Sequence, residues 1–171
     1  MPSAEDQIGA AVFPLPASQR AGAAVLGYGK DGKLVPLRVG TNDMICLASP
    51  PAEKDLHVSC YHGSMEPFMA RGRSLRAAGI TVLAKVDSVR FKEVKEGTIK
   101  MPQGPAMLYQ LFGGSYDPVK KEIVGARALY VAYIPGATAA STGLPDRPVG
   151  SAPWIMFPGT PKAHIMFTPT M

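Results

Sequence analysis

The stretch "HVSCYHGSMEPFMARGR", residues 57–73, decides the fold class, because its hydrophobic pattern changes partway along. Residues 57–61 alternate between the two faces of a strand. From Ser64 onward the apolar residues recur at helical spacing, and Pro67 is acceptable in a first turn, where backbone N–H groups have no intrahelical partner. The sequence therefore predicts a strand that leads into a helix, which Gly79 ends.

Around this unit, strands outnumber helices. Two apolar stretches, 23–28 and 33–37, flank the Asp31-Gly32 pair, which favours a tight hairpin turn. Ser3 is the expected N-cap of a short N-terminal helix. Further strands are expected at residues 43–48, 56–61, 98–102, 106–113, 126–135, 152–157 and 163–167.

A second helix is expected over residues 87–97, capped by Asp87 or Ser88, although the preceding segment also reads as strand. Residues 135–162 form an unusually long Gly/Pro-rich loop, and loops of this kind are often functional. We predict an α+β fold in which a curved, mainly antiparallel sheet packs against one or two helices.

The composition indicates one globular domain, residues 1–171, with 46% hydrophobic residues and many turns from 18 glycines and 17 prolines. The net charge of +5 is spread out, without the basic run and interleaved aromatic residues typical of nucleic-acid binding. We therefore expect no nucleic-acid partner, while a small-molecule or anionic ligand stays open. No apolar run approaches the roughly 20 residues of a transmembrane segment.

Cys46 and Cys60 are the only two cysteines, and each lies in an apolar, alternating stretch. Two neighbouring strands would align them for a disulfide, which would stabilise the fold by about 3 kcal/mol for a loop of this size. The alternative is a pair of buried thiols in a cytosolic protein. Cys60 is a candidate metal ligand only if it is not bonded to Cys46.

Three residues suggest a metal centre. His62 lies in the turn before the central helix, Glu66 lies in the first turn of that helix, and His164 follows a Gly/Pro-rich turn. Two imidazoles and a carboxylate, with one position left for water, form the ligand set of catalytic zinc or of a facial-triad iron site. In the alternative reading, Glu66 binds backbone donors at the helix start and both histidines are ordinary residues.

In an enzyme of this kind, the metal held by His62, Glu66 and His164 would activate water. Tyr61 would donate a hydrogen bond, and Arg71 or Arg73 would position an anionic substrate. The resulting hypothesis is a metal-dependent enzyme with His62, Glu66 and Tyr61 as its catalytic residues.

Other chemistries fit fewer residues. Nine methionines, including Met65, Met69 and Met166 near histidines, are ligands that copper accepts, although methionine at helical spacing usually fills a core. A serine hydrolase is a weaker alternative, because the chain lacks the Gly-x-Ser-x-Gly motif.

A metal-free lyase acting on acidic saccharides is a further alternative. It would use a tyrosine as a proton carrier together with His62 and an arginine such as Arg71. The candidate tyrosines are Tyr61, Tyr109, Tyr130 and Tyr133.

Three stretches, "CYHGSMEPFMARGRSLRAAG", "YIPGATAASTGLP" and "PWIMFPGTPKAHIM", resemble those of a family of small, uncharacterised exported bacterial proteins. The resemblance implies a periplasmic or secreted location and a disulfide between Cys46 and Cys60, and it implies no activity. We therefore expect an exported protein with a metal or small-molecule site. A non-catalytic, ligand-binding or copper-binding periplasmic protein is the main alternative to the enzyme.

Overall fold

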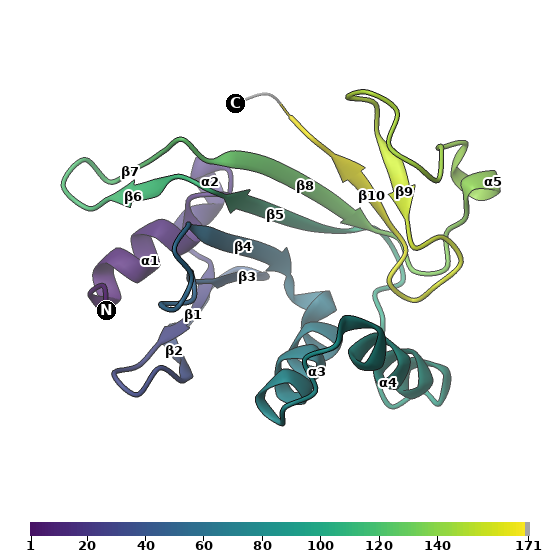
Figure 1. Cartoon of the computed structure of the whole chain (residues 1–171), viewed down its shortest axis with the longest axis horizontal. Coiled ribbons are helices and arrows are strands. Elements are labelled where there is room, and N and C mark those ends of the chain that lie inside the picture. The colour runs from purple at the N-terminus through teal and green to yellow at the C-terminus, as the bar shows by residue number, and fades with distance from the viewer. Residues whose placement is uncertain (170–171) are drawn as a thin grey trace. The chain divides into compact units, whose positions relative to one another are not determined.

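The computed structural model describes residues 1–169 and shows an α+β fold. Eight strands form a large, open and mostly antiparallel sheet, accompanied by a few helices (Figure 1). The predicted fold class is confirmed.

The chain divides into two compact units. The first unit consists of Met1–Gly63, Met107–Val131 and Phe167–Met171, and the second consists of Ser64–Ala106 and Ala132–Met166. This division does not test the expectation of one domain, which stays a prediction.

The first unit holds most of the strands. Its sheet order is β2-β1-β3-β4-β5-β8, in which β1 and β3 are parallel. The elements are α1 (Ala4–Val12), α2 (Ala17–Arg20), β1 (Ala24–Tyr28), β2 (Leu34–Arg38), β3 (Met44–Leu47), β4 (His57–His62), β5 (Ala106–Phe112), the separate hairpin of β6 (Ser115–Asp117) and β7 (Glu122–Val124), and β8 (Arg127–Tyr133).

Helix α1 covers one face of these strands and builds the core there. Ser3 caps the helix, as predicted, by accepting a hydrogen bond from the Asp6 backbone N–H at 3.1 Å. Ala11 and Leu15 are buried against Val25 of β1 and Cys46 of β3.

The disulfide is present. Cys46 and Cys60 are directly opposite each other on β3 and β4, and their sulfur atoms are bonded at 2.05 Å. Both side chains are fully buried beneath α1, so the cross-link also forms part of the core. The disulfide prediction is confirmed.

The second unit contains the remaining helices and the last two strands. Helices α3 and α4 lie side by side (Figure 1), with the rings of Phe68 and Phe91 6.5 Å apart. The elements are α3 (Glu66–Ala77), which follows a 3-10 turn at Gly63–Met65, α4 (Leu83–Lys95), α5 (Ala139–Thr142), and the antiparallel pair β9 (Trp154–Met156) and β10 (His164–Phe167).

Three features of the structure differ from the sequence prediction. Helix α4 begins at Leu83, so Asp87 lies inside the helix, where its carboxylate binds other side chains and caps nothing. Residues 98–102 form no strand, because the backbone N–H groups of Thr98 and Ile99 bind the Glu93 carbonyl at the end of α4. The β6–β7 hairpin was not predicted.

The segment predicted as a long loop, residues 135–162, is largely irregular but contains the short helix α5. Thr138 and Ser141 form a capping box around α5, and Gly143 ends that helix with a φ of 70°.

No helix within residues 1–169 is both long and apolar enough to cross a membrane.

Candidate functional site

The predicted metal centre receives no support. Within residues 1–169, no group of three or more His, Cys, Asp or Glu side chains is placed to hold a metal ion. His62 is the last residue of β4, and Glu66 forms an ion pair with Arg73 at 2.6 Å. Cys60 is excluded as a thiolate ligand by its disulfide. Met65, one of the candidate copper ligands, is fully buried.

The two arginines proposed for substrate binding already hold carboxylates of the protein. The Arg71 guanidinium donates to both Glu93 oxygens, with distances from Nε of 3.0 and 2.8 Å. This hydrogen bonding lowers the pKa of Glu93. Arg73 donates to Glu66. A role of either arginine in binding an anionic substrate stays a prediction.

The predicted tyrosines fall into different surroundings. Tyr61 is 1% exposed and packs in the core, so a substrate would have to penetrate the fold to reach it. Tyr109 and Tyr130 meet edge to face, with ring centroids 5.2 Å apart, beside a hollow of about 320 Å³ in the first unit. Tyr133 instead packs against His164 in the second unit, with centroids 4.9 Å apart.

A buried polar cluster includes His164, and we call it the Asp87 cluster. It combines charged groups, an imidazole, a phenol and two aromatic rings from α3, α4, the end of β8, the segment between β9 and β10, and the first residue of β10. Its members are Phe68, Asp87, Arg90, Tyr133, Phe157, Lys162 and His164.

One carboxylate joins the two cations of this cluster. Arg90 donates to Asp87 Oδ1, and the Lys162 ammonium lies 3.0 Å from Asp87 Oδ2. Their exposed side-chain fractions are 4% for Arg90 and 12% each for Asp87 and Lys162. The second unit thus holds a charge network that is largely shielded from water.

Aromatic rings support both cations of the cluster. The Arg90 guanidinium lies 3.8 Å from the centre of the Phe68 ring, and the Lys162 ammonium lies 4.3 Å from the centre of the Phe157 ring. Such contacts offset part of the cost of removing a cation from water.

The titrating groups of the Asp87 cluster respond to burial in different ways. Burial raises the pKa of Tyr133 to about 12. Burial would also raise the pKa of Asp87, but hydrogen bonds from Arg90 and Lys162 outweigh it and leave that pKa below its usual value. Burial lowers the pKa of His164 by more than the hydrogen bond to the Lys162 carbonyl raises it, and the Lys162 charge also lowers it.

The tautomer of His164 follows from its main-chain contact. Its Nδ1 lies 2.7 Å from the Lys162 carbonyl oxygen, which only accepts, so Nδ1 carries the proton. The neutral imidazole that burial favours therefore presents Nε2 as an acceptor.

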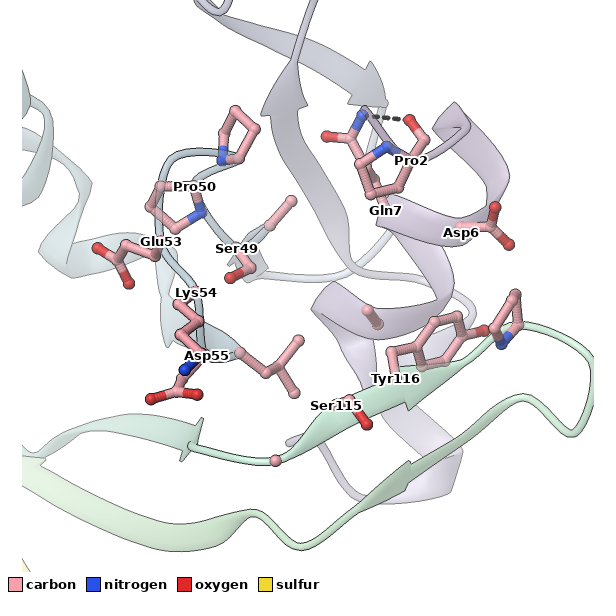
Figure 2. Close-up of a pocket in the computed structure, with 16 residues that line it drawn as sticks. Pro2, Asp6, Gln7, Ser49, Pro50, Glu53, Lys54, Asp55, Ser115 and Tyr116 are labelled. Carbon is pink, nitrogen blue, oxygen red and sulfur yellow. Dashed lines mark hydrogen bonds between the residues drawn. The ribbon is translucent and has the colours of Figure 1, made fainter.

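A cavity of about 450 Å³ lies in the first unit, and Figure 2 shows its walls. Helix α1 and the loop at residues 48–56 face each other across it, and the start of the β6 hairpin closes one end. Its size falls within the range of small-molecule sites. The apolar part of the lining includes Ala10, Pro50, Leu56 and Pro118.

The charged groups of this cavity are mostly acidic. Asp6, Glu53 and Asp55 line it with a single ammonium group, that of Lys54. Glu53 also lies 3.4 Å from the His57 imidazole. Within residues 1–169, neither Asp6 nor Asp55 takes part in an ion pair.

Two polar residues that line the cavity, Gln7 and Tyr116, differ in how their side chains could contact a ligand. The Gln7 amide is committed to the fold, because it exchanges hydrogen bonds with the Tyr28 backbone N–H and carbonyl at 2.8 and 3.1 Å. The Tyr116 ring borders the cavity near Asp6 (Figure 2). Burial, and then the Asp6 charge, raises the pKa of Tyr116, so its hydroxyl keeps its proton at neutral pH.

Sequence reasoning named His164 and Tyr133 but missed their neighbours. Asp87 and Arg90 stand three residues apart in a helix, a spacing that signals a pair on one helix face. Lys162 comes next to Asp87 only through tertiary folding. The same is true of the separate segments that line the cavity.

Comparison of the chain with protein-family models, with curated proteins and with solved structures finds no match. The functional proposal consequently depends on the geometry of this chain alone.

Proposed function

We propose that this protein binds a small organic cation, without chemistry, in the cavity between α1, residues 48–56 and β6. The observation that carries the proposal is the composition of the cavity lining, which among the described residues combines apolar side chains with three acidic residues and one lysine. This acidic lining occurs in a chain whose net charge is +5. An amine with an apolar body is complementary to both features.

Each part of the wall has a function in this proposal. Asp6 and Asp55 stand on opposite walls of the cavity (Figure 2) and make its surroundings negative, which favours a cation, since neither carboxylate is neutralised by an ion pair within the described residues; Asp6 also accepts a hydrogen bond from the Ser3 hydroxyl at 2.6 Å. Leu56 and the prolines cover the apolar body. The face of the Tyr116 ring offers a cation a further favourable surface.

The disulfide supports an extension of the proposal to the cellular compartment. A buried Cys46–Cys60 bond is typical of an oxidising environment. The proposed protein is thus a ligand-binding protein of the periplasm or the extracellular space. Fractionation of cells that produce the native full-length protein tests this part, and recovery of reduced protein from the cytoplasm alone would contradict it.

The binding proposal is tested with three probes of similar shape and different charge. Phenethylammonium, 2-phenylethanol and 3-phenylpropionate carry the same ring on a short chain and are cationic, neutral and anionic, respectively. Titration followed by backbone NMR shifts should show saturable changes in α1, residues 49–55 and β6 for the cation. The neutral probe should bind more weakly and the anion not at all.

Charge variants show whether the carboxylates cause this preference. Asp6→Asn combined with Asp55→Asn should weaken binding of phenethylammonium about three- to tenfold, the range for two partly exposed ion pairs. Asp43→Asn, an exposed aspartate of the first unit outside the cavity, is the matched control and should bind like the wild type. Equal binding of all three probes, or shifts located elsewhere, would overturn the proposal.

A further inference from the structure

The Asp87 cluster contains more positive than negative charge. Arg90 and Lys162 are both cations, and Asp87 is the single carboxylate that either of them contacts within residues 1–169. The other titrating members do not balance the excess, because burial keeps Tyr133 protonated and His164 neutral at pH 7. An uncompensated buried charge is expensive, and proteins normally pair it.

A second observation concerns the hydrogen bonds of Arg90. The residue is 3% exposed, and its Nε is a buried donor without an acceptor in the described part of the chain. Its other nitrogens are used, one by Asp87 and one by the Phe68 carbonyl at 3.2 Å. Buried donors normally have partners, so each exception needs an explanation such as an unseen ion.

The third observation is the backbone at Phe157. Its φ is 53°, in the left-handed region, and the next residue is Pro158. A bulky residue before proline rarely adopts this conformation. The strained turn holds the Phe157 ring against both Lys162 and His164, and strain of this kind is concentrated at functional sites.

From these three observations we infer that the second unit binds a small oxyanion, a carboxylate or inorganic phosphate, at Lys162 and Arg90. The anion supplies the missing negative charge and an acceptor for the unused donors, while Asp87 keeps the two cations in place. The edge of the cluster meets solvent through Asp87 and Lys162, each with 12% of its side chain exposed. This site is independent of the acidic cavity in the first unit and takes a ligand of opposite charge.

The test uses acetate and inorganic phosphate as separate probes, each compared with sodium chloride at the same ionic strength. In the wild type, at least one of the two oxyanions should raise the melting temperature in a saturable way. Lys162→Met keeps an apolar stem over Phe157 and removes the excess charge, so half-saturation should need at least tenfold more anion. Lys85→Met, an exposed lysine of α4, is the control and should respond like the wild type.

General salt effects are distinguishable from binding. Phosphate stabilises many proteins by exclusion from their surface, and that effect would be the same in the wild type and in both variants. Equal responses in all three proteins, or no response beyond that of chloride, would overturn the inference.

A measurement on the wild type alone covers the case in which Lys162→Met does not fold. The Nε–H resonance of Arg90 should shift on titration with acetate or with phosphate, together with the amides of residues 157–164. If neither probe moves the Arg90 resonance, the inference is wrong.

Discussion

The Asp87 carboxylate binds two cations at once, Arg90 through Oδ1 and Lys162 through Oδ2 at 3.0 Å. Lys162 lies 75 residues further along the chain, so this contact ties α4 to the segment before β10. Because all three side chains are shielded from water, the carboxylate has more influence on stability than a surface charge.

Asp87→Asn should therefore lower the free energy of unfolding by about 3–5 kcal/mol, the range for removing one partner of a buried ion pair. Urea denaturation measures the change. Glu96→Gln removes the carboxylate of an exposed pair with Lys92 and should cost less than about 1 kcal/mol. If both variants lose the same small amount, the Asp87 carboxylate is not the centre of a buried network.

Adding Lys162→Met to Asp87→Asn should recover part of the lost stability. The double variant retains only one unpaired cation, Arg90, instead of two. A double variant that is less stable than Asp87→Asn would show that the Lys162 ammonium contributes chiefly through its contact with the Phe157 ring and not through its pair with Asp87.

His164 should make stability depend on pH below neutrality. Burial lowers its folded-state pKa, whereas the unfolded imidazole takes up a proton near pH 6.5. The unfolded state thus binds more protons as the pH falls below about 6.5, and the free energy of unfolding decreases there by up to about 1.4 kcal/mol per pH unit. Above that pH the contribution is fully present.

Urea denaturation between pH 5 and 7.5 tests this pH dependence. His164→Gln should flatten the decrease below pH 6.5, whatever its effect on stability at pH 7.5. The control is Gln103→Leu, an exposed substitution that removes no titrating group, and it should keep the wild-type slope. An unchanged slope in His164→Gln would mean that His164 is not the group responsible.

Local sequence rules predicted the parts of the fold that depend on near neighbours. The Ser3 cap, the hairpin around Asp31-Gly32 and the disulfide between adjacent strands each follow from spacing over a few residues or from alternation. The start of α4 was missed because Asp87 is a favourable capping residue. In the structure its carboxylate is used in tertiary contacts instead.

The candidate sites were much less predictable. The sequence identified His164 as a candidate metal ligand and Tyr133 as a candidate proton carrier. Periodicity does not show which residues from distant parts of the chain contact them. The acidic cavity combines α1, an irregular loop and a hairpin that lie far apart in sequence. Tertiary packing decides which charged side chains of such segments come together, and a single sequence does not show that packing.

Removal of the disulfide should destabilise the protein by about 3 kcal/mol, as expected for a loop of this length. The Cys46→Ala, Cys60→Ala double variant and the reduced wild type should show similar losses in urea denaturation. Free-thiol titration before and after reduction verifies the starting state. A reduced wild type as stable as the oxidised protein would contradict the prediction.

Gln7 should be one of the most sensitive polar residues of the first unit. The residue is 7% exposed, and its side chain both donates to and accepts from the Tyr28 backbone, which joins α1 to the end of β1. Gln7→Leu fills similar space but removes both bonds to Tyr28, together with the bond that the Gln7 amide donates to the Pro2 carbonyl at 3.2 Å. Each partly buried backbone group that loses its bond to Gln7 costs about 1–2 kcal/mol, so we expect a loss of about 2–4 kcal/mol in the free energy of unfolding.

The matched control is Gln103→Leu, because Gln103 is exposed and lies outside every helix and strand. That substitution should change stability by less than about 0.5 kcal/mol. Amide hydrogen exchange at Tyr28 adds a local test, since its protection should fall in Gln7→Leu and stay unchanged in the control. Normal protection of the Tyr28 amide in a destabilised Gln7→Leu protein would place the effect in side-chain packing and not in the link between α1 and β1.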